Sequence, residues 1–198
     1  MRSMKLVALG ALSLLSLAGC LQGQPRIYRV ALDETPIRTV NTPTCFRNSV
    51  LPTGRNNTTE LNYRSEDEWV IWGGAGTKEY LDLGTQAWTL GDAPVIRVTD
   101  LIEGEDKVFT ATRNVQTPFG DRYTELRATN VSATFDDYSA VPVGTISLNS
   151  QFACAKGSGG ECPTGMNIAQ DAASCQGNLK FVARRIDVQQ LTVYDNNP

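Results

Sequence analysis

Cysteine offers the most chemistry in this chain, because histidine is absent from all 198 residues. Without an imidazole there is no base for a Ser-His-Asp or Cys-His mechanism and no imidazole ligand for a metal. A thiol can be acylated, oxidised to a disulfide or bound to a metal, depending on its surroundings. The candidate residues for such chemistry are Cys20, Cys45, Cys154, Cys162 and Cys175.

Cys20 follows a segment with the composition of an export signal. Arg2 and Lys5 give a positive start, residues 6–17 carry no charge, and an alanine and a glycine precede the cysteine. A positive region, an apolar core of about 7–15 residues and a small-residue exit are the parts of such a signal. The apolar run is too short for a transmembrane helix, which needs about 20 residues. An ordinary secretory signal, in which Cys20 has no special role, is the other alternative.

The four residues Leu17-Ala18-Gly19-Cys20 resemble the lipobox of bacterial lipoproteins. The resemblance implies that signal peptidase II removes residues 1–19, and that Cys20 then carries a diacylglyceryl thioether and an acylated amine, with fatty acids such as palmitate. Two or three acyl chains make a durable membrane anchor, since each buried methylene contributes about 0.8 kcal/mol. In the enteric pattern an aspartate after the cysteine retains the protein at the inner membrane, so Leu21 implies the outer membrane, on its periplasmic or its surface side. We expect a signal peptide at 1–19, a lipidated tether at 20–26 and a single β domain at 27–198.

The four remaining cysteines predict two disulfides, because they are even in number in a chain that is expected to be exported. Three pairings are possible, and the sequence does not choose among them. We favour Cys162–Cys175, which closes a short loop, together with Cys45–Cys154. A zinc site with four thiolates is the alternative, but its ligands usually come as close CxxC pairs, which are absent here. No metal and no cofactor are predicted.

Acidic residues form three clusters that could bind calcium or serve a glycosidase. None has the spacing of a calcium-binding loop, and a glycosidase needs two carboxylates about 5–9.5 Å apart across a cleft. We therefore expect the acidic side chains of these clusters to be exposed to solvent in turns, and we predict no catalytic residue. The clusters are Glu66-Asp67-Glu68, then Glu103 with Glu105 and Asp106, and Asp136-Asp137.

The glycine-rich segment at 73–78 lacks the spacing of a phosphate-binding loop. It also precedes a predicted strand rather than a helix N-terminus, where backbone donors would converge on an anion. A hairpin turn is the prediction here.

Three tryptophans are candidates for binding a sugar or another ligand. Trp69 and Trp72 lie in the most apolar predicted strand, where large aromatic side chains usually belong to the core. Trp88 lies near a predicted turn, so we expect it to be the exposed one.

The charge balance argues against nucleic acid as a partner. Eighteen basic residues face 21 acidic ones, which gives a net charge of −3, and no basic cluster occurs in the chain. A protein that binds nucleic acid needs a basic surface to neutralise phosphates.

The segments that must position these residues have the patterns of short strands separated by turns. Alternation is strictest at 144–154, where Thr145, Ser147, Asn149 and Gln151 form one face and apolar residues the other. This pattern is typical of an antiparallel strand with one solvated side. The other predicted strands are 27–32, 68–72, 78–83, 95–102, 107–113, 122–135 and 179–194.

The predicted strands do not alternate with helices, as they would in a protein with a parallel sheet. The sequence therefore predicts an all-β fold. An antiparallel β-sandwich is the first choice, and a closed β-barrel or calyx is the alternative. We expect one short helix at 167–175 and a long connection at 35–59 that contains no regular helix, since it holds three prolines.

Three functions are compatible with this sequence. The first is a non-catalytic, membrane-anchored envelope lipoprotein with a structural role or an envelope protein partner. The second is a carrier of a small ligand or lipid, with a calyx lined by Trp69, Trp72 and Phe109. The third is a hydrolase that uses carboxylates, or a serine without histidine. We favour the first, since no catalytic spacing is present, and expect the protein not to be an enzyme.

Overall fold

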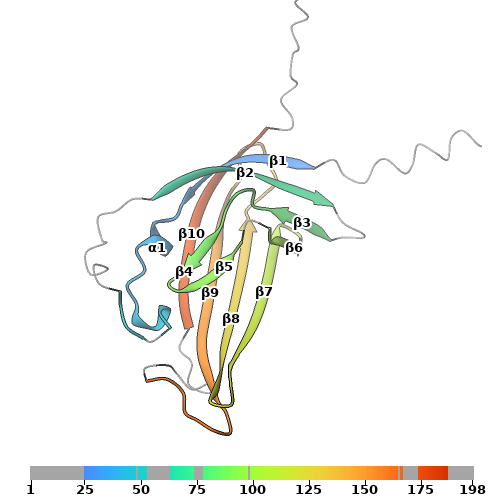
Figure 1. Ribbon diagram of the computed structural model, residues 1–198. Helices are drawn as coiled ribbons and strands as arrows, with labels where there is room; N and C mark the ends of the chain where they lie inside the picture. The colour runs from blue at the N-terminus through green and yellow to red at the C-terminus, as the bar shows by residue number, and fades with distance from the viewer. Residues whose placement is uncertain are drawn as a thin grey trace, which may run out of the picture.

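The computed structural model describes residues 25–47, 49–52, 63–73, 78–97, 99–164, 166 and 174–186, and most of these residues lie in β-strands (Figure 1). The exceptions to β-structure are helix α1 (Thr35–Arg38) and the 3-10 turn η1 (Pro43–Cys45). The strands are β1 (Arg26–Asp33), β2 (Arg64–Gly73), β3 (Glu79–Asp82), β4 (Trp88–Leu90), β5 (Ala93–Ile96), β6 (Leu101–Glu105), β7 (Val108–Phe119), β8 (Tyr123–Phe135), β9 (Val143–Lys156) and β10 (Ser174–Arg185).

Eight strands form a closed antiparallel barrel in the order β1-β10-β9-β8-β7-β6-β3-β2, while β4 and β5 form a separate two-stranded sheet. Strands β7 to β10 are the long ones. They extend side by side well beyond the part that closes the barrel (Figure 1). The all-β fold is thus confirmed, and so is the closed barrel predicted as the alternative, but the strands do not form the sandwich that we placed first.

The alternation predicted for 144–154 is confirmed in β9. Ile146 and Leu148 are buried on the inner side, and Thr145, Ser147 and Gln151 are exposed on the outer side. A strand with one face on the core and one in solvent has this period of two. The pairing of β9 with β8 and β10 carries the same two-sided pattern into both neighbours.

Aromatic side chains fill the inside of the barrel. The ring of Phe181 lies 5.0 Å from that of Trp69 and 4.9 Å from that of Phe135, and Phe109 packs against Phe135 at 5.9 Å. All four side chains are almost fully buried. Gly144, opposite Phe181 in the β9–β10 pairing, makes room for this cluster, because a Cβ there would lie 2.3 Å from Phe181 Cζ. The core is therefore centred on aromatic rings from four different strands.

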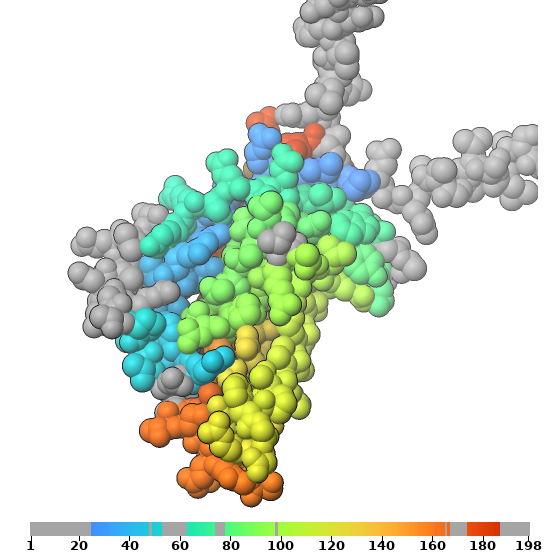
Figure 2. Space-filling view, in the orientation of Figure 1, coloured from blue at the N-terminus to red at the C-terminus, as the bar shows by residue number. Residues whose placement is uncertain are grey.

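The inner face of the extended strands is covered by α1, η1 and the β4–β5 hairpin. These segments contact β8, β9 and β10, and Figure 2 shows them on the surface that faces the viewer. Gly177 in β10 permits their close approach, since a Cβ there would come within 2.9 Å of Ile37 and 3.0 Å of Leu90. The inner face of β8, β9 and β10 is thus covered by other segments of the chain where these strands extend beyond the barrel.

Tyr138, in the β8–β9 connection, is partly buried and packs against the aromatic core beside Phe135. Its ring lies 6.1 Å from that of Phe135 and 3.8 Å from the guanidinium carbon of Arg26. Glu79 accepts a hydrogen bond from the Tyr138 hydroxyl and forms an ion pair with Arg26. Burial raises the pKa of the Tyr138 phenol well above its usual value, and the hydrogen bond to Glu79 adds to this rise.

Most of the predicted strands are present, although their ends differ. The segment 95–102 is divided between β5 and β6, and the connection at 35–59 contains α1, because Pro36 at the start of a helix costs no hydrogen bond. Residues 74–77 of the predicted hairpin turn lie outside the described residues, but β2 and β3 pair on either side of them. Segments predicted correctly as strands are 27–32, 68–72, 78–83, 107–113, 122–135 and 144–154.

The two described residues of the predicted helix at 167–175 are not helical. Residues 167–173 lie outside the described residues, and Ser174 and Cys175 begin β10. Most of the predicted strand at 179–194 belongs to β10 as far as Arg185, while 187–194 lie outside the description.

Residues 1–24, which hold the expected leader and Cys20, also lie outside the described residues. No helix in the described part of the chain is both long and apolar enough to cross a bilayer.

Candidate functional site

The four cysteines outside the leader form two disulfides, as predicted, but with a different pairing. The bridges are Cys45–Cys175 and Cys154–Cys162, so the favoured pairing of Cys162 with Cys175 and of Cys45 with Cys154 is wrong. Cys162 lies beside Cys154 at the end of β9, whereas the register of β9 and β10 places Cys175 opposite Ser150, away from Cys162. Cys175 therefore faces η1, and Cys154 is left to pair with the loop that follows β9.

The three tryptophans do not form a common site. Trp69 and Trp88 are buried, with their rings 6.5 Å apart, so the prediction that Trp88 is exposed is wrong. Its indole nitrogen donates to Gln86 and Glu34 in the core, which explains how a tryptophan beside a turn can be buried. Trp72 is half-buried on the other face of β2 and packs against Tyr80, at 6.1 Å between ring centres. It therefore cannot line a calyx together with Trp69.

The acidic clusters have local roles in turns and ion pairs. Asp67 accepts hydrogen bonds from the backbone and hydroxyl of Thr85, at 2.9 and 2.6 Å. Asp137 accepts one from the Ser139 N–H, and the hydrogen bonds from Ser139 lower the pKa of this carboxyl. No group of three or more acidic or cysteine side chains that could hold a metal ion occurs among the described residues.

Two glutamates are buried in the described part of the chain, and each is paired with an arginine. Glu34 accepts hydrogen bonds from Arg38 at 2.8 Å and from Ser65 at 2.9 Å, and Glu125 forms an ion pair with Arg47 at 3.0 Å. Buried carboxylates with such partners stabilise the fold when every lone pair is satisfied. They hold α1 and the η1 segment on the inner face of the sheet.

The outer face of β7–β10 is different, because it contains a stretch of uncharged side chains, which ends on β10 before the exposed Lys180 and Arg184. In one row across the four strands, Thr112, Asn130, Asn149 and Gln176 are register partners. The adjacent row contains Thr110, Ser132, Ser147 and Asn178. We define the neutral face as these outward residues and those that continue them along the strands: Thr110, Thr112, Asn114 and Gln116; Leu126, Ala128, Asn130 and Ser132; Ser147, Asn149, Gln151 and Ala153; Ser174, Gln176 and Asn178.

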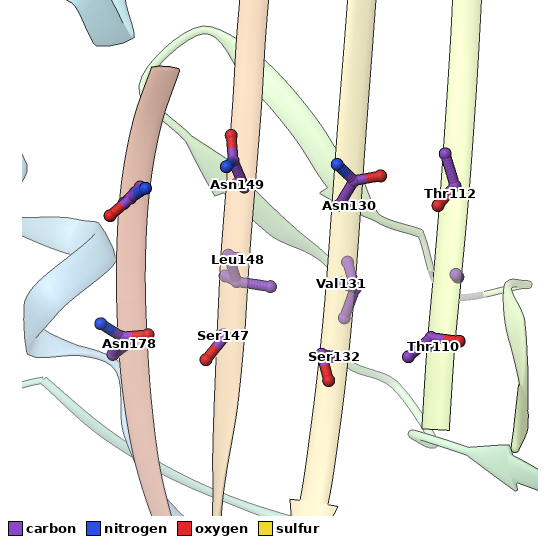
Figure 3. Close-up of a pocket in the computed structure, with 11 residues that line it drawn as sticks. Thr110, Thr112, Asn130, Val131, Ser132, Ser147, Leu148, Asn149 and Asn178 are labelled. Atoms are coloured by element: carbon purple, nitrogen blue, oxygen red, sulfur yellow. The ribbon is translucent and has the colours of Figure 1, made fainter. Parts of the chain in front are cut away.

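The neutral face contains an open groove of about 370 Å³ that spans all four strands. Figure 3 shows the two rows lining it, with the amides of Asn130, Asn149 and Asn178 and the hydroxyls of Ser132 and Ser147. A second depression, of about 250 Å³, adjoins it along β7, β8 and β9, beside Asn114, Ala128 and Gln151. Together they give a surface along which an extended ligand can lie.

The amides and hydroxyls that line the groove have no hydrogen-bond partner among the described residues. An amide group supplies two donors and an acceptor, and a hydroxyl supplies one donor and an acceptor. Neighbouring strands are about 4.8 Å apart, so each row presents such groups at regular intervals. The rows therefore form an array of hydrogen-bonding groups that a ligand can use.

The sequence predicted one of the four strands of this face, because the alternation in 144–154 identified the solvated side of β9. The other three strands were not recognised as its neighbours, because residues 112, 130, 149 and 176 are far apart in the chain. Only the strand order and register bring their side chains into one row. Alternating uncharged polar residues in 110–116 and 174–178 are the signal that could have found it.

No family model, curated protein or solved structure matches this chain.

Proposed function

We propose that this protein is a non-catalytic binding protein of the bacterial envelope, anchored in the outer membrane by lipid on Cys20. It recognises a component of the envelope with the neutral face of β7–β10. The observation that carries the proposal is the groove of about 370 Å³ on that face, lined by polar groups without partners among the described residues. A concave surface with several convergent polar groups is typical of a binding site.

The packing of the barrel favours the outer surface over the interior as the place of binding. Trp69 and Phe109, which would line a calyx, are both completely buried in contact with other aromatic rings. A carrier needs an internal space for its ligand, whereas protein cores are close-packed. A carrier function has less support for this reason.

The side-chain chemistry favours binding over catalysis. The buried carboxylates Glu34 and Glu125 are each held by an arginine, and the chain has no histidine that could act as a base. The neutral face contains no acid or base, so proton transfer to a ligand in its groove would have no side chain to use. A role in recognition requires only the amides and hydroxyls that are present.

The proposed binding face is tested by photo-crosslinking in intact cells, with a photoreactive residue placed either at Asn149 or at Glu66. Both positions are on the outer surface of the barrel, but Glu66 lies on β2, away from the neutral face. We expect a recurring adduct, of whatever chemical class, from position 149 and none from position 66. The absence of an adduct from position 149, or equal adducts from both, contradicts the proposed binding face.

The proposed anchor is tested separately with Cys20→Ala. This variant should incorporate no labelled palmitate and should leave the membrane fraction, while the wild type is labelled and sediments with membranes. Normal labelling and retention of the variant contradict the assignment of Cys20.

A further inference from the structure

We infer that the ligand of the neutral face is an uncharged glycan, several sugar units long, that lies in the groove across β7–β10. The inference rests on the proposed function, and it specifies the chemical class of the envelope component. The argument depends on the distribution of charge, on hydrogen-bonding capacity and on the extent of the groove.

Charge is distributed unevenly around the barrel. The outer sides of β1, β2, β3 and β6 carry charged residues, and so does the part of β10 beyond the neutral face, at Lys180 and Arg184, whereas no charged residue lines the groove of about 370 Å³. The charged outward residues include Arg29, Glu66, Glu68, Asp82, Glu103 and Glu105. An ionic ligand would find no opposite charge in the groove to compensate for its lost hydration. The ligand that fits this face is therefore uncharged.

The groups in the groove match a ligand rich in hydroxyls. Asn130, Asn149 and Gln176 each offer both donors and an acceptor, and Thr112 offers one of each. A sugar hydroxyl also donates one hydrogen bond and accepts others, so neighbouring hydroxyls of a glycan can pair with neighbouring side chains in a row. An apolar ligand would bury these groups without partners, and a buried donor or acceptor that loses its hydrogen bonds to water weakens binding.

The length of the face indicates more than one sugar unit. The groove of about 370 Å³ and the adjoining depression of about 250 Å³ follow one another along β7, β8 and β9. The second depression adds the apolar side chains of Leu126, Ala128 and Ala153, which can contact the C–H groups of a sugar ring. It is also lined by Arg127, whose charge is paired with that of the buried Glu125 at 3.5 Å. Polar and apolar contacts are thus available side by side, as a pyranose ring requires.

A protein partner fits this face less well. The centres of protein interfaces are enriched in aromatic residues, methionine and arginine, and a few such side chains provide most of the binding energy. No aromatic, methionine or arginine side chain lines the groove of about 370 Å³, and Arg127, which lines the second depression, is paired with the buried Glu125. A glycan can bind instead through many small polar contacts, and the groove offers these.

The inference is tested by titrating the full-length protein, in detergent, with neutral hexasaccharides: cellohexaose, maltohexaose and chitohexaose. Affinity is measured by calorimetry, and the site is located from the side-chain amide signals of Asn130, Asn149, Gln176 and Asn178 in ¹⁵N–¹H spectra. The chitosan hexamer is the matched charged control, since it differs from chitohexaose by the removal of acetyl groups that leaves cationic amines. We expect at least one neutral hexasaccharide to bind and to shift these amide signals, and the chitosan hexamer to bind at least tenfold more weakly than that ligand.

The variant Asn149→Asp introduces a charge with almost no change of shape. It should weaken binding of the neutral hexasaccharide at least tenfold and strengthen binding of the cationic chitosan hexamer. Asn41→Asp, at an exposed position between α1 and η1, is the matched control and should change neither affinity. Thr112→Val, which removes a hydroxyl without adding charge, should also weaken neutral binding, and melting curves show that each variant is folded.

The outcomes separate this inference from the function on which it rests. If no neutral hexasaccharide binds, or if the charged hexamer binds the wild type as tightly, the glycan inference is overturned. If photo-crosslinking at Asn149 then gives a protein adduct, the neutral face is still a binding face, but for a protein. If neither glycan nor adduct is found, both the inference and the proposed binding face are overturned.

Discussion

Cys45 in η1 is joined by a disulfide to Cys175 in β10, across 130 residues of sequence. Both residues are buried, and the bond fixes the α1–η1 segment to the inner face of the strands that present the neutral face outward. The other bridge, Cys154–Cys162, spans only 8 residues and holds the loop after β9 against the end of that strand. The two bonds therefore constrain very different lengths of the unfolded chain.

This difference predicts unequal effects on stability. In the chain-entropy model, removing the long-range bridge with Cys45→Ala and Cys175→Ala lowers the free energy of unfolding by about 5 kcal/mol, whereas Cys154→Ala with Cys162→Ala costs about 2.5 kcal/mol. Urea denaturation of both double variants, under oxidising conditions, measures the two losses. Equal losses, or a larger loss for the short loop, would show that the entropy of the unfolded chain does not decide the effect.

Glu34 should be more important for stability than any exposed acid, because its buried carboxylate accepts hydrogen bonds from three side chains. These donors are Ser65 at 2.9 Å, Arg38 at 2.8 Å and Trp88 at 3.3 Å. Glu34→Gln places an NH₂ group where an acceptor is required, so we expect a loss of about 2–3 kcal/mol in the free energy of unfolding.

The matched control is Glu68→Gln, since Glu68 pairs with Arg29 at 3.2 Å on the exposed surface. Exposed pairs contribute about 0–1 kcal/mol, so the control should change stability little. Thermal denaturation of both variants at neutral pH compares them, and similar losses in the two would contradict a special role for Glu34.

The ion pair of Asp100 with Arg113 predicts a loss of stability in acid. Burial by itself would raise the pKa of Asp100, but hydrogen bonds from Arg113 and the Arg97 N–H, with the charges of both arginines, hold it below its ordinary 3.8. A carboxyl with a lowered pKa stabilises the fold above the pKa of the unfolded state, and this contribution disappears as the pH falls through the folded-state pKa.

Asp100→Asn should therefore be less stable than the wild type at neutral pH, by about 1.5 kcal/mol, and the difference should shrink below pH 3.8. Urea denaturation over a series of pH values measures this difference. In an Arg113→Gln background the same substitution should have a smaller effect at neutral pH. A difference between wild type and Asp100→Asn that is constant with pH would refute the charge-based explanation.

The sequence allowed the individual strands to be predicted much better than their arrangement. The alternation of Thr145, Ile146, Ser147 and Leu148 predicts which side of β9 is buried, because the two-residue period of a strand is visible within the segment itself. Sandwich and barrel have the same local patterns, so the choice between them depends on whether β1 pairs with both β2 and β10. That pairing closes the sheet and is not encoded in any single segment.

The candidate site and the pairing of the cysteines were missed for the same reason. The row of Asn130 and Asn149 exists only because β8 and β9 have one particular register, and a shift by one residue would turn one of these side chains to the core. The register of β9 and β10 also places Cys175 opposite Ser150, away from the end of β9 where Cys162 lies beside Cys154, so the Cys162–Cys175 pairing that loop length had favoured does not form. Trp88 shows a different limit, because its burial depends on hydrogen-bond partners from Gln86 and the distant Glu34.

Gly91 and Gly120 offer a test of the close contact between the β4–β5 hairpin and η1. Both have positive φ angles, of 61° and 65°, in tight turns between paired strands. A Cβ at Gly91 would lie 1.9 Å from the carbonyl oxygen of Cys45, whereas a Cβ at Gly120 would meet nothing within 4 Å. Gly120→Ala should thus cost only the strain of a left-handed backbone, about 1–2 kcal/mol.

Gly91→Ala adds a clash with backbone that cannot move freely, because the same Cys45 carbonyl accepts a hydrogen bond from the Asp92 N–H at 3.1 Å and Cys45 is fixed by its disulfide. We expect a loss of about 3 kcal/mol or more in the free energy of unfolding, beyond the ordinary range for a single surface substitution. Urea denaturation of the two alanine variants under identical conditions compares them directly. Equal losses would mean that the hairpin can move away from η1 at little cost, and that the inner face of the sheet is less tightly covered than this contact indicates.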